Sequence, residues 1–468
     1  MQTWEHVSLW MDQLNGPLYA RPSLDHARDV DVAIIGAGYT GLWTAYYLKR
    51  LAPSLDIVVL EAETAGFGAS GRNGGWLIGG MLGESRYLQP LSPERRKAAY
   101  RLLKAIPDEV EGVLQREGID CDYRKGGMLN CAARYPEQAE RLRRELEALY
   151  REGHEESDYQ WLDRQALERH VRIEGASGAV FSPHCATIQP AKLIRGLAET
   201  VERLGVTIHD RSPVIEWGAG QLRTERAVVR AKWIVPAVEG YAARFEALRR
   251  IQIPVQSMIV ATEPLPDAVW AEIGLDQGQA LSEHSRQVTY AQRSRDGRLV
   301  FGARGGYRFK GRLRDDFRLT EDEIGLRRYL MESLFPQLRG VRLSHAWGGN
   351  LGMARRFRPH MLCDPRAGLA LAGGFGGEGV GATHLAGRTL ADLILGRDSE
   401  LVQQPWVFNG RSLDDLATWE PEPCRWLGYK AILAAFARED RVLADRHSPA
   451  WRRRLASGIA AGLEGLMQ

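Results

Sequence analysis

The first part of the chain alternates buried-strand and helix patterns. Residues 29–36 (DVDVAIIG) form an apolar run typical of a buried parallel strand, residues 42–49 have helical spacing, and residues 56–60 (DIVVL) predict a second buried strand. A strand, a helix and a strand within about thirty residues match the size of a βαβ unit. We therefore expect folded structure to begin near Asp29 with half of a Rossmann-type domain, after a polar arm.

The middle of the chain predicts two amphipathic helical segments and many short strands. Charged and apolar residues recur at helical spacing over 93–116 and 136–153, and a proline opens each segment. Short strand patterns over 206–237 are expected to rejoin the first sheet. The runs VQSMIVATEPL, RQVTYAQ and RLVFGARGG predict a second, mainly antiparallel sheet.

The last part of the chain returns to a strand followed by a helix. Residues 369–374 (LALAGG) predict a buried strand, a glycine-rich turn follows, and residues 383–395 have helical spacing. The final segment, 441–468, has a helical pattern that carries Arg452, Arg453 and Arg454. It fits either a solvated or packed helix or a helix that lies on a membrane surface.

Composition narrows the class of protein. With 468 residues, 44% of them hydrophobic and 26% charged, the chain is globular, and its net charge of +3 disfavours general nucleic-acid binding. No apolar run reaches the roughly 18 residues of a membrane span, and the first residues lack a signal-peptide pattern, so we expect a cytoplasmic protein. The 5 cysteines are scattered and no histidine pair has metal-site spacing, so we expect neither a disulfide framework nor a metal.

A glycine motif lies between the first strand and the first helix. In Gly36-Ala-Gly38-Tyr-Thr-Gly41, the first glycine permits a tight turn, the second admits a pyrophosphate, and the third lets helix and strand pack closely. Glu61 ends the second strand, where a carboxylate can accept hydrogen bonds from ribose hydroxyls and repel a 2′-phosphate. The pattern predicts an adenine dinucleotide site, and an ordinary βα turn with a surface glutamate is the alternative.

Two further glycine-rich loops follow. Residues 66–75 (GFGASGRNGG) combine backbone N–H groups with a hydroxyl, a guanidinium and an amide, which suits an extended diphosphate chain or, alternatively, a flexible surface turn. Residues 374–380 (GFGGEGV) join the late strand to the late helix.

Three stretches together carry a family resemblance. They are VAIIGAGYTGLWTAYYLKR with Glu61, GFGASGRNGGW, and LALAGGFGGEGVGATHLAGRTLADLI. On these motifs the chain resembles the FAD-dependent amine and amino-acid oxidoreductases of the D-amino-acid oxidase superfamily, which includes glycine and sarcosine oxidases, and it looks nearest to the gamma-glutamylputrescine oxidases. The resemblance implies an α/β fold with a discontinuous Rossmann-type FAD-binding domain and a second, mainly antiparallel β-sheet substrate domain.

The resemblance also implies how the chain is divided and how FAD is held. The expected segments are an N-terminal arm (1–28), three FAD-binding segments (29–90, 181–245 and 346–400), a helical part with a substrate-domain segment (91–180), the substrate domain (246–345) and a C-terminal tail with a helix (401–468). The residues expected to bind FAD are Gly36, Gly38, Tyr39, Thr40, Gly41, Glu61, Ala62, Ser70, Arg72, Asn73, Gly74, Gly75, Trp76, Val214, Ala237, Gly374, Phe375, Gly376, Gly377, Glu378, Gly379 and Val380. The N–H groups of the last seven are expected to face the flavin N1 and C2 oxygen.

Departures from the family pattern bear on the substrate and on FAD attachment. Relatives that take amino acids have a cationic carboxylate clamp near the third motif, but the stretch after Trp347 reads GGNLGM and offers none. Glu378 stands where many relatives have histidine, and a carboxylate there suits a substrate ammonium, a solvent-exposed position or pairing with an arginine. Because residues 347–353 lack the cysteine that anchors FAD in sarcosine-type enzymes, we expect non-covalent FAD.

The predicted reaction is oxidation of a small-molecule amine. Hydride transfer to flavin N5 would give an imine, which hydrolyses to an aldehyde plus amine or ammonia, and O2 or a quinone would accept the electrons. Trp76, Tyr290, Tyr307, Trp347 and Glu378 are the candidate residues around the reacting carbon. The alternatives are an amino-acid oxidase or dehydrogenase, an NAD-dependent dehydrogenase, a flavin monooxygenase and a non-catalytic flavin-binding protein. The oligomeric state is not predicted.

Overall fold

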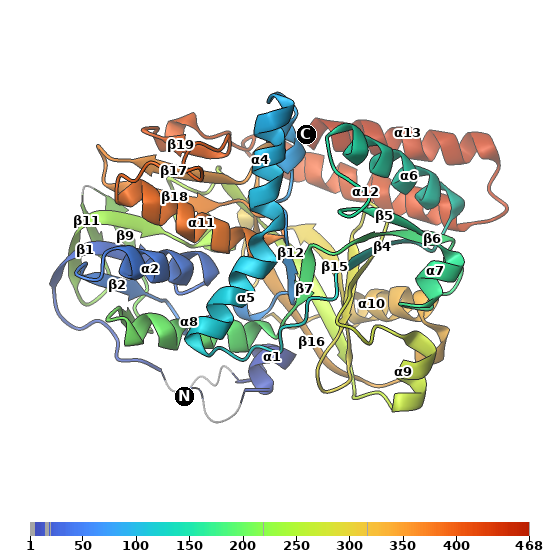
Figure 1. Ribbon diagram of the computed structural model, residues 1–468, viewed down its shortest axis with the longest axis horizontal. Coiled ribbons are helices and arrows are strands. Elements are labelled where there is room, and N and C mark those ends of the chain that lie inside the picture. The colour runs from blue at the N-terminus through green and yellow to red at the C-terminus, as the bar shows by residue number, and fades with distance from the viewer. Residues whose placement is uncertain (1–4, 15–17, 19, 219, 316, 468) are drawn as a thin grey trace.

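Two large β-sheets lie side by side in the protein, and helices cover them (Figure 1). The computed structural model describes residues 5–14, 18, 20–218, 220–315 and 317–467. The predicted fold class is confirmed, with a mainly parallel sheet on one side and a mainly antiparallel sheet on the other.

The nine-stranded sheet is the nucleotide-binding half. Its central strand β1 pairs in parallel with β2 and with β11, and the residues of all three strands are largely buried because helices cover the sheet. The strand order is β19 (Val407–Asn409), β17 (His360–Asp364), β18 (Leu369–Gly373), β11 (Val228–Pro236), β1 (Arg28–Ile35), β2 (Ile57–Leu60) and β8 (Thr207–His209). In addition, β10 (Gln221–Arg223) pairs with β11, and β9 (Glu216–Gly218) pairs with β10. Strands far apart in the sequence thus build one sheet, as the discontinuous Rossmann pattern predicted.

The eight-stranded sheet is the substrate half. Its long strands pair antiparallel. Within the described part of this sheet, β13 and β4 form the only parallel pair. The order is β16 (Leu343–Ala354), β12 (Gln252–Thr262), β15 (Leu299–Tyr307), β14 (Thr289–Arg293), β13 (Ala280–Glu283), β4 (Met128–Ala132), β6 (Gly178–Ser182) and β5 (Gln160–Asp163). A two-stranded ribbon of β3 (Trp76–Ile78) and β7 (Cys185–Thr187) completes the β-structure.

Helices form at each of the predicted helical segments, and further helices form that were not predicted. The segment 93–116 divides into two helices at Ala105, next to Pro107, and the tail forms a hairpin of two helices. The bounds are α1 (Leu9–Asp12), α2 (Tyr39–Leu51), α3 (Glu84–Leu88), α4 (Pro93–Lys104), α5 (Ile106–Glu117), α6 (Pro136–Arg151), α7 (Arg164–Glu168), α8 (Pro190–Arg203), α9 (Asp267–Ile273), α10 (Glu321–Leu334), α11 (Gly379–Ile394), α12 (Cys424–Ala444) and α13 (Ala450–Met467). Of these, α8, α10 and most of α12 were not predicted. None of the described helices is long and apolar enough to span a bilayer.

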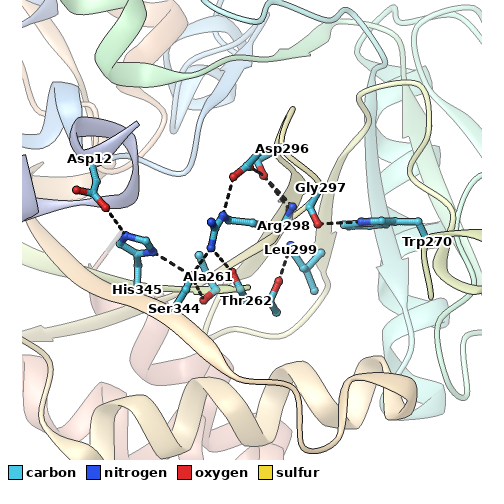
Figure 2. A network of polar contacts seen from close by, with 11 residues as sticks. Asp12, Ala261, Thr262, Trp270, Asp296, Gly297, Arg298, Leu299, Ser344 and His345 are labelled. Atoms are coloured by element: carbon cyan, nitrogen blue, oxygen red, sulfur yellow. Dashed lines mark hydrogen bonds and ion pairs between the residues drawn. The ribbon is translucent and has the colours of Figure 1, made fainter. Parts of the chain in front are cut away.

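The N-terminal segment is folded, which corrects the expectation that structure begins near Asp29. Trp10 on α1 is 1% exposed, its indole N–H donates to the carbonyl of Asn73 at 2.8 Å, and its ring meets that of Trp347 edge to face. Asp12 of the same helix contacts His345 on β16 at 3.0 Å, beside the Arg298 and Ser344 network (Figure 2). A helix of only four residues is too short to give a periodic signal, and its stability comes from these tertiary contacts.

Three strands depart from the expected domain boundaries, and one of them, β6, runs across the expected boundary between residues 180 and 181. β16 belongs to the substrate sheet as far as Ala354, although 346–400 was assigned to the nucleotide unit, and β19 joins the nucleotide sheet from beyond residue 400. The pattern of one strand shows that the strand exists but does not show which strand it pairs with. The sheet to which each strand belongs could therefore not be predicted from the sequence.

Candidate active site

A cavity of about 260 Å³ lies at the carboxyl end of the central strands of the nucleotide sheet. The ends of β1 and β2, the start of α2, the loop after β11 and the start of α11 line it. This edge, where parallel strands end and helices begin, is where open α/β sheets bind nucleotides.

The glycines of the first motif act as predicted from their spacing. Gly36 has φ +102, and a Cβ there would lie 2.7 Å from the carbonyl oxygen of Ala237 on the neighbouring connection. A Cβ on Gly41 would collide with the Gly36 carbonyl, so this glycine permits close packing of helix on strand. Gly38 is the N-cap residue of α2 and supplies no side-chain cap; the N–H of Tyr39 donates to the Ser70 hydroxyl at 2.9 Å, and the rest of the first turn faces the cavity.

Glu61 is held in place by backbone donors. Its carboxylate accepts from the N–H of Ala37 at 2.8 Å and from the N–H of Glu63 at 3.0 Å. Burial raises the pKa of Glu61 to about 7. The acid therefore has the predicted position at the end of β2, with lone pairs left for ribose hydroxyls.

The third glycine loop is organised by a carboxylate that the sequence did not indicate. Glu239, half-buried at the start of the 3-10 helix after β11, accepts from the N–H groups of Gly374 and Phe375, both at 3.1 Å, and desolvation raises its pKa to about 7. The N–H of Gly376 donates to Gly352. The N–H groups of Gly374, Phe375 and Gly376 are therefore used inside the protein. The cavity is instead offered the N–H groups of Gly379 and Val380 in the first turn of α11, where the N-cap residue Glu378 makes no side-chain cap.

A second cavity, of about 550 Å³, lies between the two sheets and meets the first. Both cavities are lined by Ala69, Asn73, Leu351, Gly377 and Val380. An elongated ligand in the first cavity can therefore present one end to a second molecule in the other.

The wall of the second cavity near this junction is aromatic and acidic. Trp76 and Tyr290 line it and pack edge to face at 5.5 Å, while the Tyr290 hydroxyl bonds to Ser257 at 2.6 Å. Burial raises the pKa of Tyr290 to about 12, so the phenol stays protonated. Glu378 also lines this cavity, and burial raises the pKa of its carboxyl, although the nearby Arg304 guanidinium acts in the opposite direction.

The comparisons with known proteins agree with this geometry. Residues 31–393 match the family model described as FAD dependent oxidoreductase. The chain belongs to this FAD-dependent oxidoreductase family. It is 30% identical to the probable oxidoreductase OrdL of Haemophilus influenzae over 88% of this chain and 95% of that protein. It is 29% identical to the gamma-glutamylputrescine oxidoreductase of Escherichia coli, over 84% of this chain and 90% of that protein.

Solved structures share the fold of this FAD-dependent oxidoreductase. Glycine oxidase from Geobacillus kaustophilus superposes with a TM-score of 0.66 at 21% sequence identity, covering 82% of this chain and all (100%) of that one. The family model and the curated relatives confirm the predicted family and enzyme class, and FAD is the cofactor of the family.

The residues of the chain fit FAD. Arg72 is 1% exposed, and its guanidinium lies over the ring of Phe317 at 3.2 Å and over that of Phe67 at 4.3 Å. Its three nitrogens have no hydrogen-bond partner among the described residues. Burial lowers the pKa of Arg72 to about 10. Because a buried cation without an acceptor is costly, an electron-rich or anionic ligand at the junction would compensate it.

The structure brings most of the predicted site residues to the two cavities. The first is lined by Gly36, Gly38, Tyr39, Thr40, Glu61, Ala62, Ser70, Asn73, Val214, Ala237, Phe375, Gly377, Gly379 and Val380, and the second by Arg72, Gly74, Trp76, Tyr290, Gly376 and Glu378. Gly41, Gly75 and Gly374 stand behind the lining and permit close backbone packing.

Trp347 and Tyr307 do not line either cavity, contrary to expectation. The Trp347 indole donates to the carbonyl of Arg72 at 3.0 Å, which supports the second glycine loop from behind. The Tyr307 hydroxyl contacts Glu422 at 2.5 Å under the C-terminal tail. Their positions depend on which sheet face each strand presents to the cavity, and strand alternation alone does not show which face that is.

Several lining residues were missed by sequence reasoning. Arg304 on β15 lines the second cavity and donates to the carbonyl of Gly376 at 3.3 Å. A cation within a strand whose other residues are mostly buried was a usable signal. Phe436 and Glu464 reach the same cavity from the C-terminal hairpin, whose contribution no motif indicated. The described residues contain no cluster suited to a metal ion.

Proposed function

We propose that this enzyme oxidises the C–N bond of a primary or secondary amine without an α-carboxylate, in the cytoplasm and with non-covalent FAD. The observation that carries the proposal is the Glu378 carboxylate in the second cavity, close to the residues that both cavities share. A half-buried carboxylate at this place attracts a substrate ammonium. No cysteine lines either cavity among the described residues, which supports non-covalent attachment.

FAD, when bound, would supply a two-electron acceptor for the substrate hydride, with dioxygen as the final acceptor that is reduced to hydrogen peroxide. Glu378 would orient the incoming ammonium, and the rings of Trp76 and Tyr290 would exclude water around it. Desolvation lowers an amine pKa, which favours the neutral amine that can lose a hydride from carbon. The N-terminus of α11 would stabilise negative charge at the adjacent cofactor edge.

The overall chemistry balances for an amine. The substrate loses a hydride from carbon and a proton from nitrogen to become an imine, and water converts the imine to an aldehyde plus ammonia or an amine. Dioxygen takes the two electrons and two protons. No lysine lines the second cavity within the described chain. Either an arginine of this cavity assists the reaction with dioxygen, or the electron acceptor is a different molecule, such as a quinone.

Arg304 favours a second candidate substrate class. Its guanidinium lies in the same cavity as Glu378 and forms no ion pair among the described residues. A guanidinium is a good partner for a carboxylate, so an α-amino acid could be held between Arg304 and the cofactor.

Anaerobic mixing of the yellow enzyme with a panel of polyamines, N-methyl amino acids and D- and L-amino acids tests both candidates. We expect amines without an α-carboxylate to bleach the flavin absorbance fastest. Preferential bleaching by α-amino acids, abolished in Arg304→Met, would instead establish the second candidate. Persistent colour with every compound would contradict both.

The role of Glu378 is tested by a conservative variant. We expect Glu378→Gln to raise the KM for amines at least tenfold, roughly the loss of one charge-assisted contact, with FAD still bound. Glu145→Gln is the matched control, because Glu145 lines the same cavity but pairs with His284 at 3.2 Å. Equal effects of the two variants would show that Glu378 has no specific part in amine binding.

A further inference from the structure

The outer face of α13 carries a continuous apolar stripe. Trp451, Leu455, Ile459 and Leu466 recur at helical spacing and are 67%, 51%, 42% and 69% exposed. They supply four of the eleven large apolar side chains that are exposed in the described residues. On a helical wheel they fall on one face, because they are separated by four, four and seven positions.

The opposite side of the helix is fixed to the body of the protein. Ala456 and Ala460 are buried, and Ala460 packs with Ile432 and Phe436 of α12. Arg453 pairs with Glu137 on α6 at 2.7 Å. Figure 1 shows α13 along the outer edge of the molecule, above α12. The helix therefore has its internal partners already, and the stripe is a separate, outward surface.

Basic residues flank the stripe. Arg452 and Arg454 are exposed on either side of Trp451, and Arg441 and Arg446 are exposed at the same end of the hairpin. None of these four arginines forms an ion pair within the described part of the chain. A tryptophan and leucines bordered by exposed arginines are the pattern of a helix that lies in the interface of an anionic membrane.

We propose that α13 docks this protein on an anionic membrane surface, with the apolar stripe at the level of the headgroups. Charge favours this occupant over a second copy of the chain, since two copies would bring the same arginines together. The exposed apolar area also disfavours a second copy, because four partly exposed side chains of one helix cover less than the roughly 800 Å² per partner of a stable protein interface.

Vesicle flotation of the purified, FAD-loaded full chain tests the proposal. We expect it to float with phosphatidylcholine–phosphatidylglycerol vesicles, to stay behind with pure phosphatidylcholine, and to be released by added salt. Trp451→Ser/Leu455→Ser and, separately, Arg452→Glu/Arg454→Glu should each lower the bound fraction at least tenfold, roughly the effect of losing the apolar anchor or two surface charges.

The matched control is Leu326→Ser/Tyr329→Ser on α10, where two exposed apolar side chains, 41% and 63% exposed, lie on a helix with an acidic first turn. This variant should float like the parent. The proposal is overturned if the parent protein floats with neither type of vesicle, or if it floats equally with both. Light scattering on the same samples tests the alternative that the stripe binds a second copy of the chain. A parent protein that is dimeric, with a Trp451→Ser/Leu455→Ser variant that is monomeric, would establish that alternative and overturn the proposal.

Discussion

Burial of Arg72 without an acceptor raises the free energy of the protein before FAD binds. Its neighbours Phe67 and Phe317 offer only their ring faces, which compensate part of the lost hydration. The backbone around it is fixed, since the Trp347 indole holds the Arg72 carbonyl and Asn73 bonds to Ser70 and Gly75. The side chain is thus positioned in advance for a ligand.

Replacing Arg72 should change stability and FAD affinity in opposite directions. We expect Arg72→Met to stabilise the FAD-stripped protein by about 1–2 kcal/mol, because a buried unpaired charge is removed, and to weaken FAD binding at least tenfold, roughly one charged hydrogen bond. Urea unfolding of stripped protein and fluorescence titration with FAD measure the two effects. Arg72→Lys keeps the charge and is the control, and a loss of stability in stripped Arg72→Met would contradict this account.

Glu84 gives a pH-dependent contribution to folding. Burial, and to a smaller extent the nearby Glu378, raise its pKa to about 8, while the N–H of Met81 donates to its carboxylate at 2.7 Å. A folded-state pKa above the unfolded value means that the group stabilises the fold at low pH and that this contribution is lost as the pH rises through 8.

The pH profile of stability should therefore flatten in Glu84→Gln, which keeps an acceptor for Met81. We expect the loss of unfolding free energy between about pH 5 and pH 8 to be smaller than in the parent by about 1–3 kcal/mol, after allowance for the partial exposure of Glu84. Urea unfolding at the two pH values measures it. A variant with the parent's slope would show that Glu84 ionises normally.

At the scale of elements, the N-terminal helix supports the second glycine loop. Ser8 and Trp10 donate to the carbonyls of Gly71 and Asn73, and Gln189 on the connection to α8 donates to the Trp10 carbonyl at 2.7 Å. One turn of helix thus fixes the loop that carries Arg72, although the two segments are more than sixty residues apart.

Truncation of Trp10 should therefore reduce both stability and FAD retention. We expect Trp10→Ala to cost about 3–5 kcal/mol, the range for deleting a large buried aromatic side chain, and to release FAD on dilution. Chemical unfolding and the absorbance of the gel-filtered protein report the two effects. His6→Ala, whose side chain is exposed, is the control, and full FAD retention in Trp10→Ala would separate α1 from the cofactor site.

Elements with strong local patterns were predictable, and those defined by distant contacts were not. β1, α2 and β2 follow from buried-strand runs and a glycine motif whose steric demands are local. α1 has one turn and the β3–β7 ribbon has three residues on each side, so neither gives a periodic signal. Of the hairpin, only the segment 441–468 was predicted as helical, so most of α12 was missed, and the break at residues 445–449 was not recognised because it holds few strong breakers apart from Pro449.

The same limit applied to the site. Gly36, Gly38 and Glu61 were identifiable because their roles depend on a βαβ turn that the sequence encodes in one stretch. Glu239 and Arg304 act through partners more than seventy residues away, Gly374 for Glu239 and Gly376 for Arg304, and no local spacing predicts such pairs. Tyr290 was correctly placed in the cavity while Tyr307 was not, since aromatic residues serve the core equally well.

At the scale of the whole molecule, the C-terminal hairpin closes the substrate cavity. Glu439 on α12 is fully buried and accepts from Arg141 at 2.5 Å and from Arg286 at 2.6 Å, and Arg286 also pairs with Glu464 on α13. These ion pairs join the hairpin to the substrate domain on the side away from the nucleotide sheet (Figure 1). The hairpin lies beyond residues 31–393, which match the family model, so this part of the cavity wall is contributed by a segment outside the matched region.

Changes in the hairpin should consequently alter substrate binding and leave the cofactor in place. Phe436 lines the second cavity, whereas Ile432, one turn earlier on α12, packs in the same apolar cluster without reaching the cavity. Both Phe436→Ala and Ile432→Ala remove core packing and should lower stability by about 2–5 kcal/mol. Only Phe436→Ala should raise the KM for the best amine, several-fold and with little change in kcat, because it widens the binding space away from the reacting carbon. Steady-state kinetics with flavin absorbance as a loading control measure this, and parallel changes in KM for the two variants would mean that the hairpin acts through stability alone.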